Sequence, residues 1–164
     1  FDFENSAIIA ADGAVGAVGE LAKLACVVTD FDGNPHLDRA AKSGTTFVAH
    51  AHGDNIPQWQ DCLSKWRDFQ HPPELILTHQ VSESIDGVYN FGGFTDGDRA
   101  VCLAIGLGVA KEDITLLGFS TSKIGKWSGQ TNPKRKLAKL AWMLRVLQII
   151  GLEEQVDTNA FEVL

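Results

Sequence analysis

Short apolar runs rich in Ile, Val and Leu recur along the chain, and segments with helical periodicity lie between them. The runs predict strands at Ala7 to Ala11, Cys26 to Thr29, Thr46 to Ala49, Leu75 to Thr78 and Thr115 to Gly118. The helical patterns lie at about Val15 to Leu24, Pro35 to Lys42, Pro57 to Phe69, Asp96 to Val109 and Pro133 to Ile150. Strands that alternate with helices in this way predict an α/β fold, with a doubly wound, mainly parallel sheet and helices on both faces.

Three segments between or after these elements are less regular. The range Asp86 to Phe94 is compatible with either an additional short strand or a loop that leads into the next helix. The range Phe119 to Asn132 is rich in Ser, Thr and Gly, which is typical of a mobile loop, and we interpret it as a candidate lid. The acidic tail from Leu152 to Leu164 stays unassigned, and with no repeat or linker we predict a single domain.

Composition and charge exclude several classes of protein. The chain has 164 residues, enough for one domain with a core, and its formal charge of −7 argues against a nucleic-acid-binding surface. No apolar run approaches the length of a membrane span, and the three cysteines form no CxxC pair, so we expect a cytoplasmic protein with reduced thiols. Because the chain begins at Phe1 and its one methionine is Met143, we expect it to lack its natural N-terminal segment.

Polar and acidic residues follow the apolar runs, where the predicted strands end. In a parallel sheet these ends meet at one edge, so residues from separate runs can converge on one ligand. An anionic ligand among carboxylates needs a cation between them, and we therefore predict a site for Mg²⁺ and a polyphosphate. The residues gathered by this argument are Asp12, Asp30, Asp32, His50, His52, Asp54, Asn55, Gln80, Asp96, Asp98 and Arg99.

The segment VVTDFDG places Asp30 and Asp32 directly after a predicted strand. Two carboxylates so close in sequence can share a hard cation such as Mg²⁺. The alternative is a simple turn, in which Asp32 and Gly33 supply the backbone geometry and Asp30 makes an Asx hydrogen bond. The residues alone leave both interpretations open.

The segment AHAHGDN carries His50 and His52 on one side of a predicted strand end, followed by Asp54 and Asn55. It resembles the HxHxDH zinc motif of metallo-β-lactamase-type hydrolases, except that Asn55 stands where that motif has its last histidine. We therefore interpret the two histidines as hydrogen-bonding and substrate-contacting residues. A zinc hydrolase remains the alternative.

The segment NFGGFTDGDRA combines Gly92 and Gly93 with Thr95 or Asp96 as a helix cap, and Asp98 and Arg99 in the first turn. Free amides and an arginine at a helix start are typical of a phosphate or nucleotide site, whereas the alternative is an ordinary capped helix. The loop residues Lys123 and Lys126 are further candidates to clamp phosphates, or else solvated surface charges. Trp127, in the same loop, is a candidate stacking surface for a flat ring.

Taken in order, AADGA, VVTDFDG, HAHGDN and NFGGFTDGDRA resemble the archaeal 6-hydroxymethyl-7,8-dihydropterin diphosphokinase family. The resemblance covers Ile8 to Lys126. That family is similar in turn to thiamine diphosphokinase, but Gly33 stands here where the thiamine enzymes have a serine. A thiamine diphosphokinase-like transferase is therefore the less favoured alternative.

The resemblance implies transfer of a diphosphoryl group from ATP to the hydroxymethyl oxygen of the pterin, with release of AMP, and a homo-oligomer is possible. It implies Mg²⁺ ligands at Asp30, Asp32 and Asp54, which with Arg99 are the predicted catalytic residues. Substrate contacts are expected from Asp12, His50, His52, Asn55 and Gln80. Nucleotide contacts are expected from Gly92, Gly93, Thr95, Asp96, Asp98, Arg99, Lys123 and Lys126. A catalytically silent nucleotide-binding domain is a further alternative.

Overall fold

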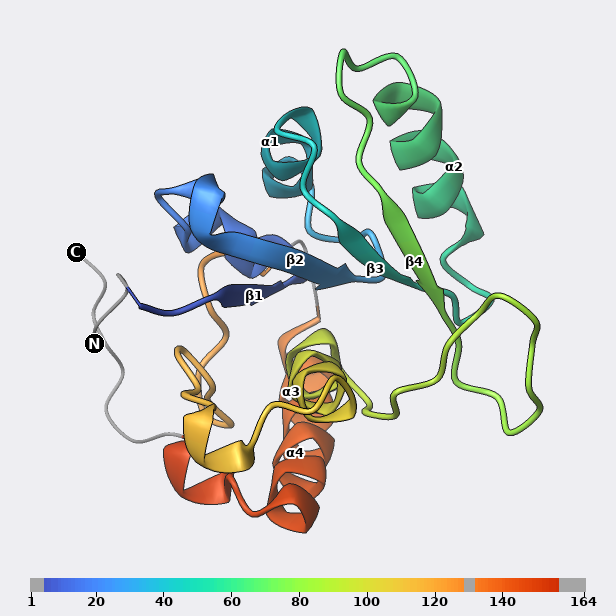
Figure 1. The fold of residues 1–164 in the computed structure, drawn as a ribbon. Coiled ribbons are helices and arrows are strands. Elements are labelled where there is room, and N and C mark those ends of the chain that lie inside the picture. Colours follow the sequence, from blue (N-terminus) through green and yellow to red (C-terminus); the bar gives the residue numbers. More distant parts are fainter. Residues whose placement is uncertain (1–4, 129–131, 157–164) are drawn as a thin grey trace. The chain divides into compact units, whose positions relative to one another are not determined.

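The structure is a computed structural model that describes residues 5–128 and 132–156 (Figure 1). The chain forms two compact units, the first extending to Asn90 and the second beginning at Phe91. The single-domain organisation expected from the sequence stays a prediction.

The first unit contains a four-stranded parallel sheet in the order β1-β2-β3-β4 (Figure 1). Its strands are β1 (Ile8–Ala11), β2 (Leu24–Thr29), β3 (Phe47–His50) and β4 (Leu75–Thr78). Each forms where the sequence has a short apolar run. Strands β2 and β3 are mostly buried, as continuous apolar runs predict, whereas Ile76 and Leu77 of the edge strand β4 are exposed. The predicted α/β class with a parallel sheet is confirmed.

The strand connections of the first unit contain η1 (Asp12–Ala17), η2 (Leu21–Lys23), α1 (His36–Lys42) and α2 (Ile56–Trp66). Each strand pairs with the next strand along the chain, so right-handed crossovers place these connections on one face of the sheet. Helix α1 accordingly packs against both η1 and α2.

One helix prediction in this unit is wrong. The range Val15 to Leu24 forms the 3₁₀ segments η1 and η2 rather than an α-helix, and Leu24 already belongs to β2. Gly16 and Gly19 lie inside the range, and each glycine disfavours an α-helix by about 1 kcal/mol relative to alanine.

The core of the first unit lies between the sheet and its helices. Trp66, at the end of α2, is 1% exposed and its ring centroid lies 4.6 Å from that of Phe47 in β3 and 5.5 Å from that of Phe31. The Trp66 indole Nε1 donates to Asp38 Oδ1 of α1 at 2.7 Å, so its polar atom is paired as well as its apolar surface buried. This packing holds the loop after β2 against the helices.

The second unit consists of α3 (Asp96–Gly106), η3 (Lys111–Asp113), α4 (Pro133–Ile150) and η4 (Glu153–Gln155). Its core contains Val101, Leu116, Met143, Leu147 and Leu152. Helix α4 begins and ends where the sequence predicts, with a proline in its first turn and Gly151 in the left-handed region (φ 84°) after its end.

The strand predicted at Thr115 to Gly118 is wrong, because these residues belong to no strand. The Leu116 side chain is buried in the core of the second unit, while its backbone N–H donates to Gln155 Oε1 at 2.7 Å. Gln155 Nε2 in turn donates to the Ile114 carbonyl at 3.0 Å. One amide side chain thus bonds to the backbone on both sides of Thr115, where a neighbouring strand would otherwise do so.

The less regular segments are loops over the residues that the structure describes. Between Asp86 and Phe94 there are only isolated bridges, Thr78 to Tyr89 and Ile85 to Val88, so the loop alternative holds there. Residues 119–128 contain no regular element, and residues 129–131 of the candidate lid lie outside the described residues. Of the acidic tail, residues 157–164 likewise lie outside them. The lid function stays a prediction.

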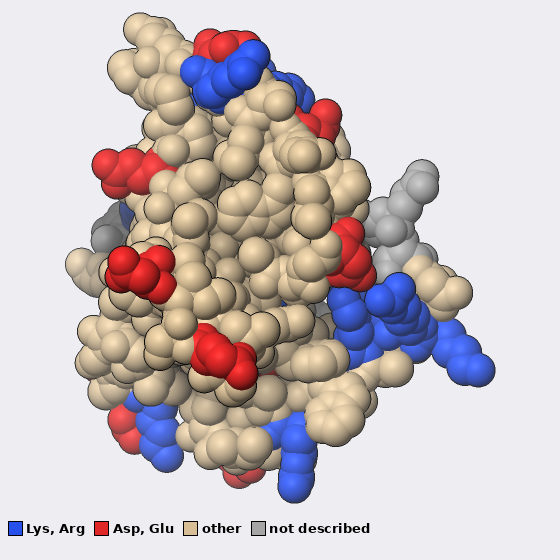
Figure 2. Space-filling view, turned by 90° about the vertical axis from the view of Figure 1, so that its right-hand side faces the viewer, with Lys and Arg blue, Asp and Glu red and all other residues tan. Residues whose placement is uncertain are grey.

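The surface and the thiols agree with the composition. On the face drawn in Figure 2 most of the surface is uncharged, acidic side chains are scattered, and several Lys and Arg side chains gather at the right of the view. Cys26, Cys62 and Cys102 are free thiols, as predicted, and burial raises the pKa of Cys26 and of Cys62 to about 11. Across the described ranges, no helix has the length and apolar character needed to span a membrane.

Candidate active site

The parallel register of the first unit brings the polar strand ends to one edge of the sheet. Ala11 pairs with Val28 and Thr29 pairs with Ala49, so the residues that follow β1 and β2 are neighbours at that edge. His50, the last residue of β3, pairs with Thr78, the last residue of β4. The edge predicted from the sequence therefore exists within this unit.

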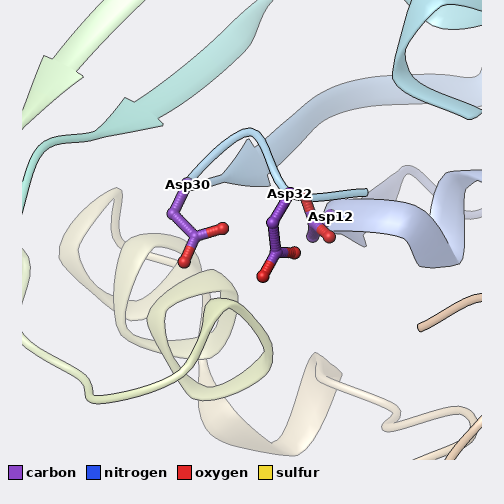
Figure 3. A group of neighbouring side chains, drawn as sticks. All are labelled: Asp12, Asp30 and Asp32. Atoms are coloured by element: carbon purple, nitrogen blue, oxygen red, sulfur yellow. The ribbon is translucent and has the colours of Figure 1, made fainter. Parts of the chain in front are cut away.

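Three aspartates meet at this edge, and we call Asp12, Asp30 and Asp32 the carboxylate triad. One carboxylate oxygen from each lies within 4.8 Å of the corresponding oxygens of the other two. Figure 3 shows that Asp30 and Asp32 come from the loop after β2, whereas Asp12 comes from the start of η1. The triad therefore depends on the pairing of β1 with β2.

Phe31 separates the two loop aspartates and anchors the loop. It is 1% exposed, its ring centroid lies 4.8 Å from that of Trp59, and its φ of 74° is in the left-handed region. Its N–H donates to Thr29 Oγ1 at 2.8 Å. A bulky residue in this backbone conformation is strained, and such strain persists only where packing over-determines it, often at a functional site.

Asp12 is buried, and two donors hold its carboxylate. Its Oδ1 accepts from Thr29 Oγ1 at 2.5 Å and from the Gly33 N–H at 3.1 Å. Burial, followed by the hydrogen bond and the negative charge of Asp32, raises the pKa of the Asp12 carboxyl to about 7. A cation beside these carboxylates would stabilise the ionised form that burial disfavours.

Gly33 makes this arrangement sterically possible. A Cβ atom at position 33 would lie 2.4 Å from Asp12 Oδ2 and 2.3 Å from the backbone nitrogen of Gly13. Any side chain here would displace Asp12. In the sequence Gly33 differs from the serine of the thiamine enzymes, but the DFDG spacing does not indicate its contact with Asp12, which is 21 residues away along the chain.

Asp30 offers an oxygen that the protein itself leaves unsatisfied. His52 Nε2 lies 3.1 Å from Asp30 Oδ2, whereas Asp30 Oδ1 is buried and has no hydrogen-bond partner among the described residues. Leaving a buried carboxylate oxygen unpaired is costly. A hard divalent cation such as Mg²⁺ prefers oxygen ligands, and the triad offers three carboxylates, of which Asp30 has one buried oxygen without a hydrogen-bond partner among the described residues. The residues therefore fit the predicted metal.

Asn55 joins the loops behind the triad. It is 5% exposed, and its Nδ2 donates to the Asp30 carbonyl at 3.0 Å and to the His50 carbonyl at 2.8 Å. Its Oδ1 accepts from the His52 N–H at 3.3 Å. Asn55 therefore supports the loop backbone, and its predicted contact with substrate stays a prediction.

The two histidines have different surroundings. His50 is 2% exposed, with Nδ1 3.1 Å from Thr78 Oγ1 and Nε2 3.4 Å from Gln80 Oε1. His52 instead faces Asp30 and Asp54. Within the described ranges, the metal-compatible group contains the triad and neither histidine, so the zinc alternative gains no support.

Asp54 lies outside the triad. Its side chain is 78% exposed, and its Oδ1 contacts His52 Nδ1. Among the described residues, the metal-compatible group contains Asp12 with Asp30 and Asp32 and does not contain Asp54, whose ligand role stays a prediction. The ADG element after the first apolar run places Asp12 at a strand end, but this pattern does not specify which strand-end aspartates meet.

In the second unit, Thr95 and Asp98 form a capping box at the start of α3. Asp98 is fully buried, and its carboxylate accepts from the N–H of Phe94 at 2.7 Å, the N–H of Thr95 at 2.6 Å and Thr95 Oγ1 at 2.5 Å. Both oxygens of Asp98 thus already serve the helix start. Its predicted nucleotide contact stays a prediction.

Gly92 and Gly93, which precede α3, differ in what surrounds them. Gly93 has φ 89°, and a Cβ there would lie 2.8 Å from both the backbone nitrogen and the Cα of Arg99, so the turn packs against the helix start. Gly92 has φ 84° with nothing near its missing Cβ. Arg99 is 8% exposed, with Nη1 3.9 Å from Asp96 Oδ1.

The predicted phosphate-clamping lysines lie on the loop between η3 and α4. Lys123 and Lys126 are exposed, and the Lys126 ammonium lies 4.7 Å from the ring centroid of Trp127. This is cation–π distance, so the Lys126 ammonium lies over the Trp127 ring, whose stacking role stays a prediction. Phosphate contacts by both lysines stay predictions.

Comparison with known proteins supports the resemblance seen in the motifs. No protein-family model matches the chain. The chain is 46% identical over 129 residues to a Pyrococcus furiosus protein named 6-hydroxymethyl-7,8-dihydropterin pyrophosphokinase, an alignment that covers 77% of this chain and 52% of that protein. It is 36% identical over 123 residues to the protein of the same name from Methanothermobacter thermautotrophicus, covering 74% of this chain and 49% of the relative.

A third archaeal protein of that name, from Methanocaldococcus jannaschii, is 36% identical over 99 residues, which are 59% of this chain and 40% of the relative. The predicted resemblance to the archaeal family is confirmed by these three matches. The chain spans about half the length of the Pyrococcus furiosus and Methanothermobacter thermautotrophicus relatives.

Proposed function

We propose that this chain carries the catalytic centre for transfer of a diphosphoryl group from ATP to 6-hydroxymethyl-7,8-dihydropterin, releasing AMP. The relatives' shared name supports the reaction and the pterin acceptor. The observation that carries the proposal is the carboxylate triad, with its buried and unpaired Asp30 oxygen, at the edge of a parallel sheet. The carboxyl edge of such a sheet is where α/β proteins bind their ligands.

In this proposal Asp12, Asp30 and Asp32 hold Mg²⁺. The cation supplies neutralisation of charge on the phosphate oxygens, which together with positioning is the main requirement of phosphoryl transfer. The chain's own contribution is to hold the three carboxylates close together despite their mutual repulsion. The Asn55, Thr29 and Phe31 contacts described above provide that restraint.

The reaction joins the hydroxymethyl oxygen to the β-phosphorus of ATP. The bond from that phosphorus to the α,β-bridging oxygen breaks, AMP leaves with the electron pair, and the hydroxyl proton is released.

The proposed residues on the side of the pterin acceptor are His50, His52, Asn55 and Gln80. The proposed nucleotide-binding residues of the second unit are Gly92, Gly93, Thr95, Asp96, Asp98, Arg99, Lys123 and Lys126. A cytoplasmic location and a homo-oligomeric state remain predictions from the sequence.

Chromatography of the nucleotide products tests the proposal. With ATP, Mg²⁺ and the hydroxymethyl pterin, AMP should form in step with diphosphorylated pterin, and EDTA should stop the reaction. Asp30→Asn and Asp32→Asn should each abolish AMP formation, because neutral amides cannot balance a metal's charge. Asp68→Asn, at an exposed aspartate of the same unit, is the matched control and should be unaffected.

Three results would reject this assignment. Formation of ADP instead of AMP would indicate attack at the γ-phosphorus. Turnover with thiamine but not with the pterin would favour the thiamine alternative, and activity that depends on Zn²⁺ without ATP would favour the hydrolase.

A further inference from the structure

The imidazole of His52 lies between one buried and one exposed carboxylate. Its Nε2 is 3.1 Å from Asp30 Oδ2, and its Nδ1 contacts Asp54 Oδ1. The side chain of Asp30 is 12% exposed, that of His52 22% and that of Asp54 78%. The three side chains therefore form a chain of contacts that runs from the solvent to the carboxylate triad.

The backbone fixes the same arrangement independently. Asn55 accepts from the His52 N–H at 3.3 Å and donates to the Asp30 carbonyl at 3.0 Å. One buried amide thus ties the main chain at position 52 to the main chain at position 30. Because both main chain and ring are held, the position of the His52 ring relative to Asp30 is strongly restrained.

The contact with His52 engages only one of the two oxygens of Asp30. Oδ2 faces the ring, while Oδ1 is buried without a hydrogen-bond partner among the residues described. Figure 3 shows that the side chains of Asp30 and Asp32 extend from the same side of the loop. Holding Oδ2 therefore orients the whole carboxylate and leaves Oδ1 available to a cation.

We infer that His52 is a positioning residue, oriented by Asp54, that sets the Asp30 carboxylate for a divalent cation, and that Asp54 is not itself a ligand of that cation. The inference rests on the metal site of the proposed function. It gives Asp54 a different role from the ligand role that the sequence motif implied. Substitution of a residue that orients a metal ligand in this way typically weakens metal binding by about 10- to 100-fold.

Binding of Mn²⁺ and Tb³⁺ to the purified protein tests the inference without turnover. Titration calorimetry reports Mn²⁺ affinity, and Tb³⁺ luminescence lifetimes in H₂O and D₂O report the number of water ligands on the ion. We expect His52→Ala to weaken Mn²⁺ binding by roughly 10- to 100-fold and Asp54→Asn to weaken it by less than about tenfold. Neither change should alter the number of waters on Tb³⁺.

Four further variants calibrate the result. Asp30→Asn should raise the number of waters on Tb³⁺ or abolish binding, because it removes a ligand. His52→Gln should restore part of the affinity lost in His52→Ala, because an amide N–H can still donate to Asp30. His71→Ala and Asp68→Asn, at exposed positions of the same unit, should leave affinity unchanged. Melting temperatures in EDTA check that each variant folds.

Several outcomes would overturn the inference. An added water on Tb³⁺ in Asp54→Asn would make Asp54 a ligand, and unchanged Mn²⁺ affinity in His52→Ala would remove the positioning role. A wild-type protein that binds neither ion would also reject it. If the ion-binding results hold but no AMP forms, the positioning role stands and the proposed reaction fails.

Discussion

At the scale of single residues, the pKa of Asp12 links protons, metal and stability. Burial and Asp32 raise this pKa from 3.8 to about 7, so the folded protein binds a proton that the unfolded chain has already released between these values. The free energy of unfolding therefore falls, through this group, as the pH rises from about 4 to 7. Metal binding to an ionised Asp12 opposes that loss.

This linkage predicts a pH-dependent effect of Asp12→Asn in EDTA. Asparagine keeps an oxygen acceptor for Thr29 and Gly33 but carries no charge at any pH. We measure the melting temperature by circular dichroism and subtract the wild-type value from that of the variant. This difference should be more positive at pH 8 than at pH 5, because only the wild type loses stability as Asp12 ionises. A difference that does not change with pH would contradict the raised pKa.

Gly33 provides a second test at this scale. Gly33→Ala would place a methyl carbon 2.4 Å from Asp12 Oδ2 and 2.3 Å from a backbone nitrogen, so the loop must shift. We expect a loss of about 1–3 kcal/mol in the free energy of unfolding, and weaker Mn²⁺ binding because Asp12 is displaced. Urea denaturation and calorimetry measure the two effects.

The control for that substitution is Gly19→Ala, in the same unit. A Cβ at position 19 meets nothing within 4 Å, so stability and Mn²⁺ binding should stay near wild type. Equal effects of the two substitutions would show that the contact with Asp12 is not responsible.

At the scale of elements, the start of α3 combines a helix cap with a predicted nucleotide site. Asp98 accepts three hydrogen bonds there and is fully buried. Asp98→Ala should therefore lower the free energy of unfolding by about 1–2 kcal/mol in urea denaturation, as expected for loss of a cap. Glu112→Ala, at an exposed position of the second unit, is the control and should be close to neutral.

At the scale of the whole molecule, a bound cation should stabilise the folded protein by mass action. At a Mg²⁺ concentration 100 times the dissociation constant, the free energy of unfolding should rise by about 2.7 kcal/mol. Scanning calorimetry of the wild type with and without Mg²⁺ measures this as an increase in melting temperature. Asp30→Asn should show no such increase, and an equal increase in that variant would place the cation elsewhere.

Most of the helices and strands can be predicted from the order of the residues alone. The apolar runs that form β1 to β4, and the limits of α4 between Pro133 and Gly151, follow from local residue preferences. The strand predicted at Thr115 to Gly118 failed because an apolar run looks the same in the sequence whether a strand or a side chain such as Gln155 bonds to its backbone, and only Leu116 of this run is buried. Only the tertiary structure distinguishes these cases.

The same division holds for the site. The DFD spacing was sufficient to pair Asp30 with Asp32, because both lie in one short loop. Which third carboxylate joins them depends on the register of β1 against β2, which sets Asp12 beside Thr29, whereas Asp54 follows Gly53 (φ 94°) and contacts His52. Strand register and loop direction are long-range properties that no local pattern specifies, so tertiary structure alone decided the membership of the carboxylate triad.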